Sequence, residues 1–255
     1  MNMQEYIILT GIILKQSPVG EYDRVVSILT KERGKISAFA RGARRNGSVL
    51  TAACQPFTYG VFSLFAGRDA YRIQSVEVKN YFEAVKTDLD ALTYGAYFCE
   101  LADYLTHENT DDREQLKLLY MTLLAIGKKR MSARLIRRVY EIRALALDGE
   151  EMQVYACVKC GNQGTGYVFS ARQGGLLCVD HCRIDYDIGE LLNPSTVYTL
   201  QYILSTTLER LYSFEVSAEV QEELDQICSA FMAEYVDQRF KSVEFIDTLT
   251  CNLTD

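Results

Sequence analysis

Four cysteines in two close pairs give the clearest chemical signal in the 255-residue sequence. Two residues separate Cys157 from Cys160, three separate Cys178 from Cys182, and 17 lie between the pairs. Such knuckles present four thiolates to one tetrahedral zinc ion. The alternatives are a chance grouping of buried cysteines, or His181 replacing one sulfur. Four protein ligands leave no coordination position for water, so we expect one structural zinc ion.

Catalytic groups are poorly represented elsewhere in the sequence. Only two histidines, His107 and His181, are present, and neither a G-x-x-x-x-G-K-[ST] nor a G-x-G-x-x-G nucleotide motif occurs. The remaining cysteines show no pairing pattern, and we expect each to be a small buried hydrophobe. They are Cys54, Cys99, Cys228 and Cys251. The sequence therefore favours a binding protein over an enzyme.

A second signal is a cluster of basic residues near the N-terminus. Six Lys and Arg residues fall within fifteen positions that contain one acid, Glu32: Lys31, Arg33, Lys35, Arg41, Arg44 and Arg45. The segment from Arg41 to Ser48 predicts a flexible loop that leaves a strand. Each guanidinium group can bind two phosphate oxygens, and each such contact releases counterions. A loop of arginines is therefore suited to a nucleic-acid backbone. The alternative is a loop that only solubilises the protein.

Aromatic residues are interleaved with this basic cluster. They are Tyr22, Phe39, Phe57, Tyr59, Phe62, Phe65 and Tyr71. Exposed rings can stack on the bases of single-stranded nucleic acid. The alternative is that the rings are buried in the core of the barrel, and for an individual Phe residue statistics favour this alternative.

The formal charge of −7 and the pI of about 5.1 conceal an uneven distribution. Residues 1–80 carry eleven Lys and Arg against six Asp and Glu, a balance of +5, and the rest of the chain carries −12. Residues 183–255 alone hold fourteen acidic and four basic side chains. Overall acidity argues against a nucleic-acid partner, but this asymmetry favours an anionic partner for the N-terminal region alone.

A weaker basic stripe is predicted on a helix from Ser132 to Leu147. At 100° per residue, four arginines fall on one side of this helix: Arg130, Arg134, Arg137 and Arg138. Glu141 lies in the middle of the stripe and dilutes its charge. The stripe is either a solvated helix surface or a second DNA-binding patch.

The elements that position these residues can be read from the hydrophobic pattern. Five short apolar runs separated by turn residues predict strands: Tyr6–Lys15, Asp23–Thr30, Lys35–Arg41, Phe57–Phe65 and Tyr71–Val78. Five strands in about 80 residues suggest an OB-fold or an SH3-like barrel, and the strand count does not choose between them.

From about Tyr81 the pattern becomes helical. Helices are predicted over residues 88–107, 111–127, 132–147, 194–208 and 217–235. The cysteine pairs, with a hairpin between them, interrupt this helical region at about residues 150–190. The expected class is α+β, with a barrel at 1–80 and a helical domain with a zinc-binding insert at 81–255.

Several motifs together resemble the RecO family of bacterial recombination mediators. They are Gly20-Glu21-Tyr22-Asp23-Arg24, Leu29-Thr30, Gly34-Lys35, Ala40–Arg44, the two cysteine knuckles with Gly174-Gly175 between them, and Arg239–Phe245. The resemblance spans nearly the whole chain. It implies an N-terminal OB-fold, a helical body and a zinc-bearing insert.

The resemblance also implies an activity. Family members bind single- and double-stranded DNA, anneal complementary strands and act with RecR to load RecA onto DNA coated by single-strand binding protein. By this resemblance Arg24, Lys35, Arg41, Arg44 and Arg45 are expected to contact the DNA backbone. The resemblance likewise makes the four cysteines of the two knuckles the metal ligands.

Two other functions compete with this interpretation. A zinc-ribbon protein with an OB-fold could bind structured RNA, and a zinc hydrolase would need an open metal site. The sequence has no run of 18 apolar residues and no secretory leader pattern near its start, so we expect a cytoplasmic, nucleoid-associated protein with no membrane partner.

Overall fold

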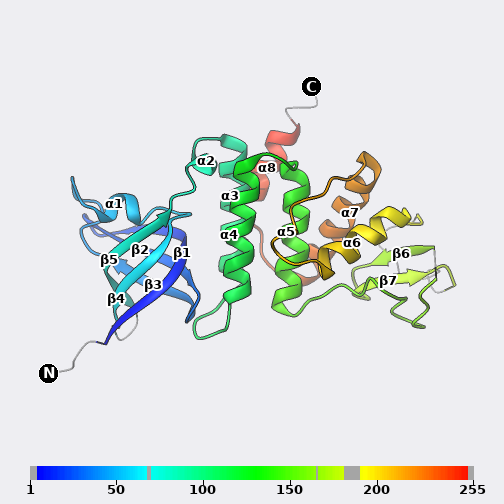
Figure 1. Cartoon of the computed structure of the whole chain (residues 1–255), viewed down its shortest axis with the longest axis horizontal. Helices are drawn as coiled ribbons and strands as arrows, with labels where there is room; N and C mark the ends of the chain where they lie inside the picture. The colour runs from blue at the N-terminus through cyan, green and yellow to red at the C-terminus, as the bar shows by residue number, and fades with distance from the viewer. Residues whose placement is uncertain (1–4, 68–69, 165, 181–189, 252–255) are drawn as a thin grey trace. The chain divides into compact units, whose positions relative to one another are not determined.

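The computed structural model describes residues 5–67, 70–164, 166–180 and 190–251 (Figure 1). The chain divides into two compact units: one comprises Met1–Lys128 and Phe240–Asp255, and the other Lys129–Arg239. The domain boundary predicted at residue 80 is the last residue of the final barrel strand. That two separately folding domains meet at this residue stays a prediction.

The N-terminal region forms a closed five-stranded barrel, as predicted. Its strands are β1 (Tyr6–Val19), β2 (Asp23–Thr30), β3 (Gly34–Ala40), β4 (Tyr59–Phe65) and β5 (Tyr71–Asn80). They hydrogen-bond in the order β1-β2-β3-β5-β4, and β4 pairs again with β1. Only β3 and β5 are parallel among these pairs. Five strands closed in this order make an OB-fold, which resolves the choice that the strand count left open.

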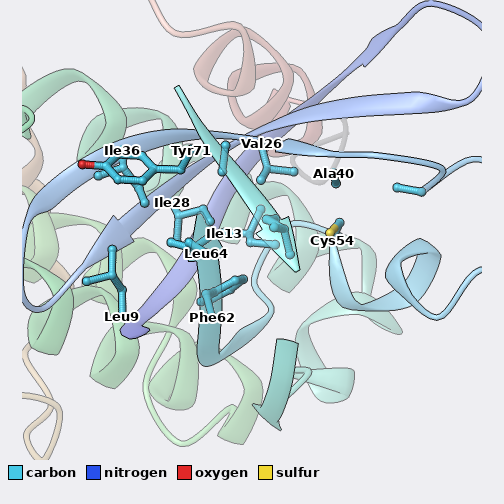
Figure 2. Close-up of a cluster of buried hydrophobic side chains, with 13 residues drawn as sticks. Leu9, Ile13, Val26, Ile28, Ile36, Ala40, Cys54, Phe62, Leu64 and Tyr71 are labelled. Carbon is cyan, nitrogen blue, oxygen red and sulfur yellow. The ribbon is translucent and has the colours of Figure 1, made fainter. Parts of the chain in front are cut away.

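Alternating burial along the strands explains why the sheet closes. In β3 and β4 every second side chain is buried, so one face of each strand turns inward and the other turns outward. The inward residues include Ile13, Ile28, Ile36, Phe62 and Leu64, each at most 1% exposed, and Figure 2 shows them converging in the barrel interior. Burial of each such side chain contributes about 1.5–3 kcal/mol.

Helices complete the unit that contains the barrel. They are α1 (Leu50–Ala53), α2 (Glu83–Lys86), α3 (Leu89–Leu105), α4 (Arg113–Lys128) and α8 (Lys241–Cys251). The carboxylate of Asp88 caps α3 by accepting a hydrogen bond from the Ala91 amide at 3.0 Å. Phe240, directly before α8, packs its buried ring against Tyr97 and Tyr104 of α3.

The second unit holds the helices and the hairpin of the insert. Its elements are α5 (Ala133–Asp148), β6 (Tyr167–Ser170), β7 (Gly175–Cys178), α6 (Pro194–Ser205) and α7 (Ala218–Tyr235). Ser132, Asn193 and Ser217 cap the three helices through their side chains. Gly149 ends α5 with a positive φ of 107°, a conformation that glycine adopts without strain.

Three helices of the structure were not predicted from the sequence. Two of them, α1 and α2, have four residues each, too few to show a helical period. The third, α8, lies within the acidic C-terminal region and depends on tertiary packing. One predicted helix was also too long, because α6 ends at Ser205 where Thr206 turns extended. Among the described residues, no helix combines the length and apolar composition needed to cross a membrane.

Candidate metal centre and nucleic-acid interface

Three of the four predicted metal ligands lie together in the second unit. The Sγ atoms of Cys157, Cys160 and Cys178 all lie within 4.8 Å of one another, and those of Cys160 and Cys178 are 3.8 Å apart. Cys157 and Cys178 are buried, whereas Cys160 is exposed. Cys182 and the alternative ligand His181 lie outside the described residues.

Local backbone hydrogen bonds build the first knuckle. The Gly161 amide donates to the Cys157 carbonyl at 2.8 Å, and the Cys157 amide donates to the Asn162 carbonyl at 2.9 Å. Gly161 has a φ of +72°, which lets the chain reverse directly after Cys160. Cys178 ends β7, and the Val158 amide donates to the Leu176 carbonyl of that strand at 2.9 Å. The hairpin therefore holds the third thiol against the knuckle.

The thiols of this cluster differ in how readily they ionise. Burial opposes the charged form of Cys157, but hydrogen bonds from the backbone at Cys178, Cys160 and Lys159 outweigh it and lower the pKa to about 6. Burial, together with hydrogen bonding to the other two thiols, raises the pKa of Cys178. Cys157 therefore becomes a thiolate, the form that binds metal, more readily than Cys178.

The cluster fits a zinc ion. At a Zn–S distance of about 2.3 Å, the sulfurs of a tetrahedral site lie about 3.8 Å apart, the separation seen between Cys160 and Cys178. Three sulfurs of such a set are in place, and the predicted fourth ligand, Cys182, follows Cys178 closely in sequence. The described residues can thus hold a metal ion.

The cysteines outside this cluster have the character of core residues. Cys54, Cys99 and Cys228 are each at most 2% exposed, and burial raises the pKa of all three thiols, that of Cys54 to about 11. They are protonated at neutral pH and pack as small apolar groups, as predicted. The side chain of Cys251 lies outside the described residues.

The arginine loop, which we define as Arg41–Arg45, directly follows β3. Gly42 has a φ of +66°, and its amide donates to the Asp23 carboxylate at 2.7 Å. Ala43 is fully buried and joins the barrel core, and the Arg44 amide donates to the Tyr22 carbonyl at 2.9 Å. Turns and a buried anchor therefore define the backbone of Arg41–Arg45, and the flexibility predicted for Arg41–Ser48 stays a prediction.

Anchoring at Ala43 leaves three arginines of the loop exposed. Arg44 donates to the Gly20 carbonyl at 3.1 Å, and the Arg45 guanidinium lies 5.2 Å from the centre of the Tyr22 ring. Arg41 lines a surface cleft. Nothing that the structure describes pairs these guanidiniums with a carboxylate. Their charge is therefore presented to solvent in one short segment.

The other two predicted DNA contacts are less exposed. The Arg24 side chain is half-buried and donates to the Thr51 carbonyl at 3.3 Å. The Lys35 ammonium donates to the Asp103 carbonyl and lies 3.6 Å from the carboxylate of the same residue. Lys35 is near the start of β3 and Arg41 follows its end, six residues or about 20 Å away. The structure does not bring Lys35 to the arginine loop.

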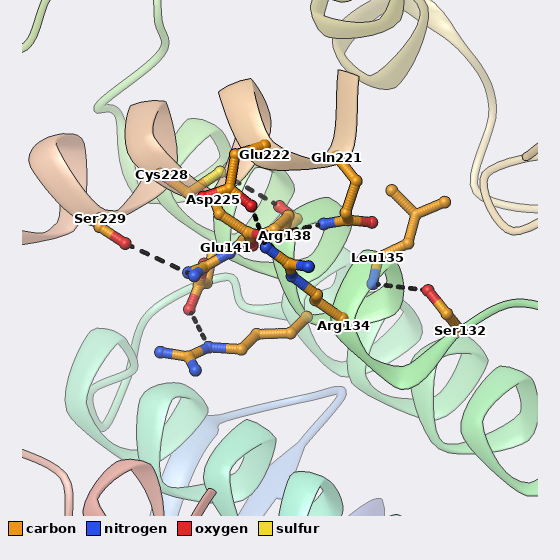
Figure 3. Close-up of polar contacts among 11 residues, drawn as sticks. Ser132, Arg134, Leu135, Arg138, Glu141, Gln221, Glu222, Asp225, Cys228 and Ser229 are labelled. Carbon is orange, nitrogen blue, oxygen red and sulfur yellow. Dashed lines mark hydrogen bonds and ion pairs between the residues drawn. The ribbon is translucent and has the colours of Figure 1, made fainter. Parts of the chain in front are cut away.

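Carboxylates occupy most of the predicted stripe on α5 (Figure 3). Arg137 and Arg138 each lie 2.8 Å from Glu141, and Arg138 also contacts Asp225 of α7. Arg134 contacts Asp225 and lies 2.7 Å from Glu222, whereas Arg130 is exposed. Glu141 therefore does not merely dilute a basic face: it is 1% exposed and pairs with two arginines. We do not include this stripe in the proposed DNA interface.

A cleft on the outer face of the barrel brings three of the interleaved aromatic residues and Arg41 together with one residue that was not predicted. Its volume is about 290 Å³, and its lining includes Phe39, Arg41, Phe65, Tyr71 and Arg72. Arg72 was not among the predicted site residues. The signal that identifies it is strand pairing, since Arg72 is the partner of both Phe39 and Phe65.

Comparison with known proteins matches both parts of the chain to one family. The family model described as "Recombination protein O N terminal" matches residues 3–82, and the one described as "Recombination protein O C terminal" matches residues 86–244. Together the two models span nearly all of the sequence.

Curated relatives agree with these matches. The chain is 35% identical to the DNA repair protein RecO of Acetivibrio thermocellus over 96% of this chain and 97% of the relative. It is 32% identical to the protein of the same name from Alkaliphilus metalliredigens, over 92% and 96% of the two chains. The corresponding protein of Symbiobacterium thermophilum is 31% identical, over 94% and 96%. The chain therefore belongs to the recombination protein O family.

Proposed function

We propose that the protein is a DNA repair and recombination mediator without catalytic activity of its own. In this proposal it binds single- and double-stranded DNA, anneals complementary strands and, with RecR, helps to load RecA onto DNA coated by single-strand binding protein. Family membership supports a role in DNA repair. The observation that carries the DNA interface is the anchored loop that exposes Arg41, Arg44 and Arg45.

The proposed mechanism follows from how the loop presents its charge. Guanidinium groups on a fixed backbone bind phosphate oxygens with little loss of conformational freedom, and each contact releases counterions. Neutralising the phosphates of one strand lowers its repulsion of a second strand. Annealing by this route needs no nucleotide hydrolysis.

In the proposal, one zinc ion has a structural role. Cys157, Cys160, Cys178 and Cys182 would hold it, and a bound ion supplies cross-links between the first knuckle and the β6–β7 hairpin. Zinc sites with four protein ligands contribute directly to folding. We therefore expect purified protein to contain one zinc per chain, lost on Cys160→Ala but retained on Cys54→Ala. Purified wild-type protein without zinc would contradict this assignment.

An annealing assay tests the main proposal. Complementary DNA strands coated with single-strand binding protein are mixed with the wild-type protein, or with a variant in which Arg41, Arg44 and Arg45 are all replaced by Ala. A control variant replaces Arg113, Lys128 and Arg239 with Ala, which removes the same charge from exposed positions outside the loop. We expect the loop variant alone to lose annealing. Equal loss in both variants would contradict the assigned interface.

A competition experiment with the wild-type protein tests whether its substrate is DNA or RNA. Competition between DNA and RNA strands of matched sequence measures which one the wild type prefers. The proposal predicts that DNA competes at least as well as RNA. A strong preference for RNA would favour the RNA-binding alternative, since the 2′-hydroxyl is what distinguishes the two strands.

A further inference from the structure

Four residues on neighbouring strands form a row across the outer face of the barrel. Phe39 of β3 pairs with Arg72 of β5, Arg72 pairs with Phe65 of β4, and Phe65 pairs with Tyr6 of β1. Neighbouring strands are about 4.8 Å apart, so these side chains lie side by side at one level. We call Phe39, Arg72, Phe65 and Tyr6 the cross-strand row.

The row presents π-faces and positive charge to solvent. Tyr6 is 52% exposed and Phe39 is 39% exposed, although residues of these types are usually more buried. The Tyr6 and Phe65 rings meet edge to face at 5.5 Å, and the Arg72 guanidinium lies 5.1 Å from the centre of the Phe65 ring. These contacts hold Tyr6, Phe65 and Arg72 together, and the exposed rings of the row are those of Tyr6 and Phe39.

The row continues into the cleft and towards the arginine loop. Phe39, Phe65 and Arg72 line the cleft together with Arg41, the first arginine of the loop. Tyr71 and Asp23 also line it. A volume of about 290 Å³ is at the lower limit of about 300–1,000 Å³ for small-molecule sites, so the cleft suits one flat ring system and not a duplex.

We propose that the cross-strand row is a stacking platform for unpaired bases of single-stranded DNA. This inference rests on the proposed function and names the part of the barrel that distinguishes single strands from duplex. One base enters the cleft against Phe39 and Phe65, and a neighbouring base lies on Tyr6. Arg41 binds the phosphate of the base in the cleft, and Arg72, which lies between Phe39 and Phe65 in the row, adds positive charge.

Duplex DNA cannot use the row in this way. In a duplex each base is already stacked on its neighbours, and its π-face is available only after unstacking, which costs a few kcal/mol. Backbone contacts from the arginine loop remain available to both forms. The loop therefore supplies general affinity, and the row adds affinity for single strands only.

The chain contains no tryptophan, which allows a direct optical test. Phe39→Trp places a single indole in the row, and Tyr198→Trp places one at an exposed position on α6, where Tyr198 is 69% exposed. Each variant is titrated with an oligothymidylate of about 16 nucleotides, the upper site size for an OB-fold. Parallel titrations use an abasic strand of equal length and a duplex.

Stacking of a base on the indole is expected to quench the emission of the Phe39→Trp variant with the oligothymidylate only. The abasic strand keeps every phosphate, so it should bind this variant without quenching. Emission from the Tyr198→Trp variant should not change with any of the three nucleic acids. Equal emission of the Phe39→Trp variant with the oligothymidylate and the abasic strand, at saturation of both, would overturn the inference.

Affinity measurements supply a second, independent test. Phe39→Ala is expected to weaken binding to the oligothymidylate at least about fivefold, the lower value for loss of one stacked base, and to leave duplex affinity unchanged. Phe39→Leu keeps the apolar cover of the barrel but not the π-face, so it should behave like Phe39→Ala. Recovery of wild-type affinity by the Leu variant would contradict stacking.

The outcomes separate this inference from the proposed function. If the wild type binds neither the oligothymidylate nor the duplex, the proposed function itself fails. If it binds both but binds the abasic strand as tightly as the oligothymidylate, the stacking platform fails and the arginine loop remains. If an RNA strand quenches the emission of the Phe39→Trp variant more strongly than DNA does, the assignment to DNA is overturned and the row binds RNA instead.

Discussion

Two groups of arginines that look alike in sequence lie in opposite environments in the structure. The arginine loop after β3 exposes Arg41, Arg44 and Arg45 around a buried alanine. On α5, Arg138 is 8% exposed and contacts the carboxylates of Glu141 and Asp225. The first group presents positive charge to solvent, and the second neutralises negative charge of its own unit.

The difference shows what decides the use of an arginine. Burial opposes the charge of Arg138, but the neighbouring carboxylates outweigh that effect and raise its pKa, so the guanidinium remains ionised within the helices. A buried charge of this kind depends on its partners. In the loop, the partners are a backbone carbonyl and an aromatic ring, which leave the charge uncompensated.

The largest expected effect comes from removing Arg138. Arg138→Ala removes the cation that Glu141 and Asp225 share and leaves each carboxylate with one arginine. Loss of one partner of a buried ion pair costs up to about 3–5 kcal/mol. The free energy of unfolding, measured by urea denaturation, should fall by that amount. Arg45→Ala, the matched change in the exposed loop, should alter it by no more than about 0.5 kcal/mol. Similar losses for the two variants would remove the contrast between the clusters.

An intermediate effect is expected at Asp103, which binds basic residues of the barrel itself. Its carboxylate lies 2.6 Å from the Lys15 ammonium and accepts a hydrogen bond from Ser27 at 2.8 Å. Asp103→Asn should lower the free energy of unfolding by about 1.5–3 kcal/mol, the usual value of a hydrogen bond to a charged group. Asp90→Asn, at an exposed position on the same helix, is the control.

The same carboxylate gives a pH dependence with a defined sign. Burial alone would raise the pKa of Asp103, but hydrogen bonds from Lys15 and Ser27 and the charge of Lys35 lower it below its ordinary value. Its contribution to stability is therefore fully present above the unfolded pKa of about 3.9 and is lost as pH falls through the folded pKa. Urea titrations between about pH 6 and pH 3 should show a smaller decline for Asp103→Asn than for the wild type. An identical decline would contradict the ion pairing.

The smallest expected effects are on DNA affinity. They distinguish a single arginine of the arginine loop from a single arginine of the α5 stripe. Arg44→Ala should weaken binding to a duplex and lower the slope of log K against log salt by about 0.9, the value for one phosphate contact on B-DNA. Arg134→Ala should leave both quantities unchanged, since Arg134 contacts Glu222 and Asp225. A comparable loss on Arg134→Ala would bring the α5 stripe back as a second DNA site.

Local sequence patterns predicted the elements of both units well. Short apolar runs between turn residues marked all five barrel strands, and cysteine spacing marked the first knuckle, because both signals depend only on neighbours along the chain. Short helices such as α1 and α2 left no periodic signal, and α8 depends on Phe240 packing against α3.

The environments of the site residues were harder to predict. Asp225, which binds Arg138, lies 87 residues away in sequence. The local signal, Glu141 three residues after Arg138, was interpreted as diluting the stripe and not as a buried partner. The cross-strand row likewise depends on pairing of β3 with β5 and of β4 with β1, strands distant in the chain. Lys35 was grouped with the arginines by its place in the sequence and by the family resemblance, but the length of β3 separates them in the structure.

Salt dependence of DNA affinity tests the central claim most directly. Duplex affinity is measured across a salt series for the wild type, for the variant with Arg41, Arg44 and Arg45 replaced by Ala, and for the control with Arg113, Lys128 and Arg239 replaced. If each loop arginine binds one phosphate, the slope of log K against log salt should fall by about 2.7 in the loop variant and remain at its wild-type value in the control. An unchanged slope in the loop variant would contradict the assignment of the arginine loop as the DNA-binding surface.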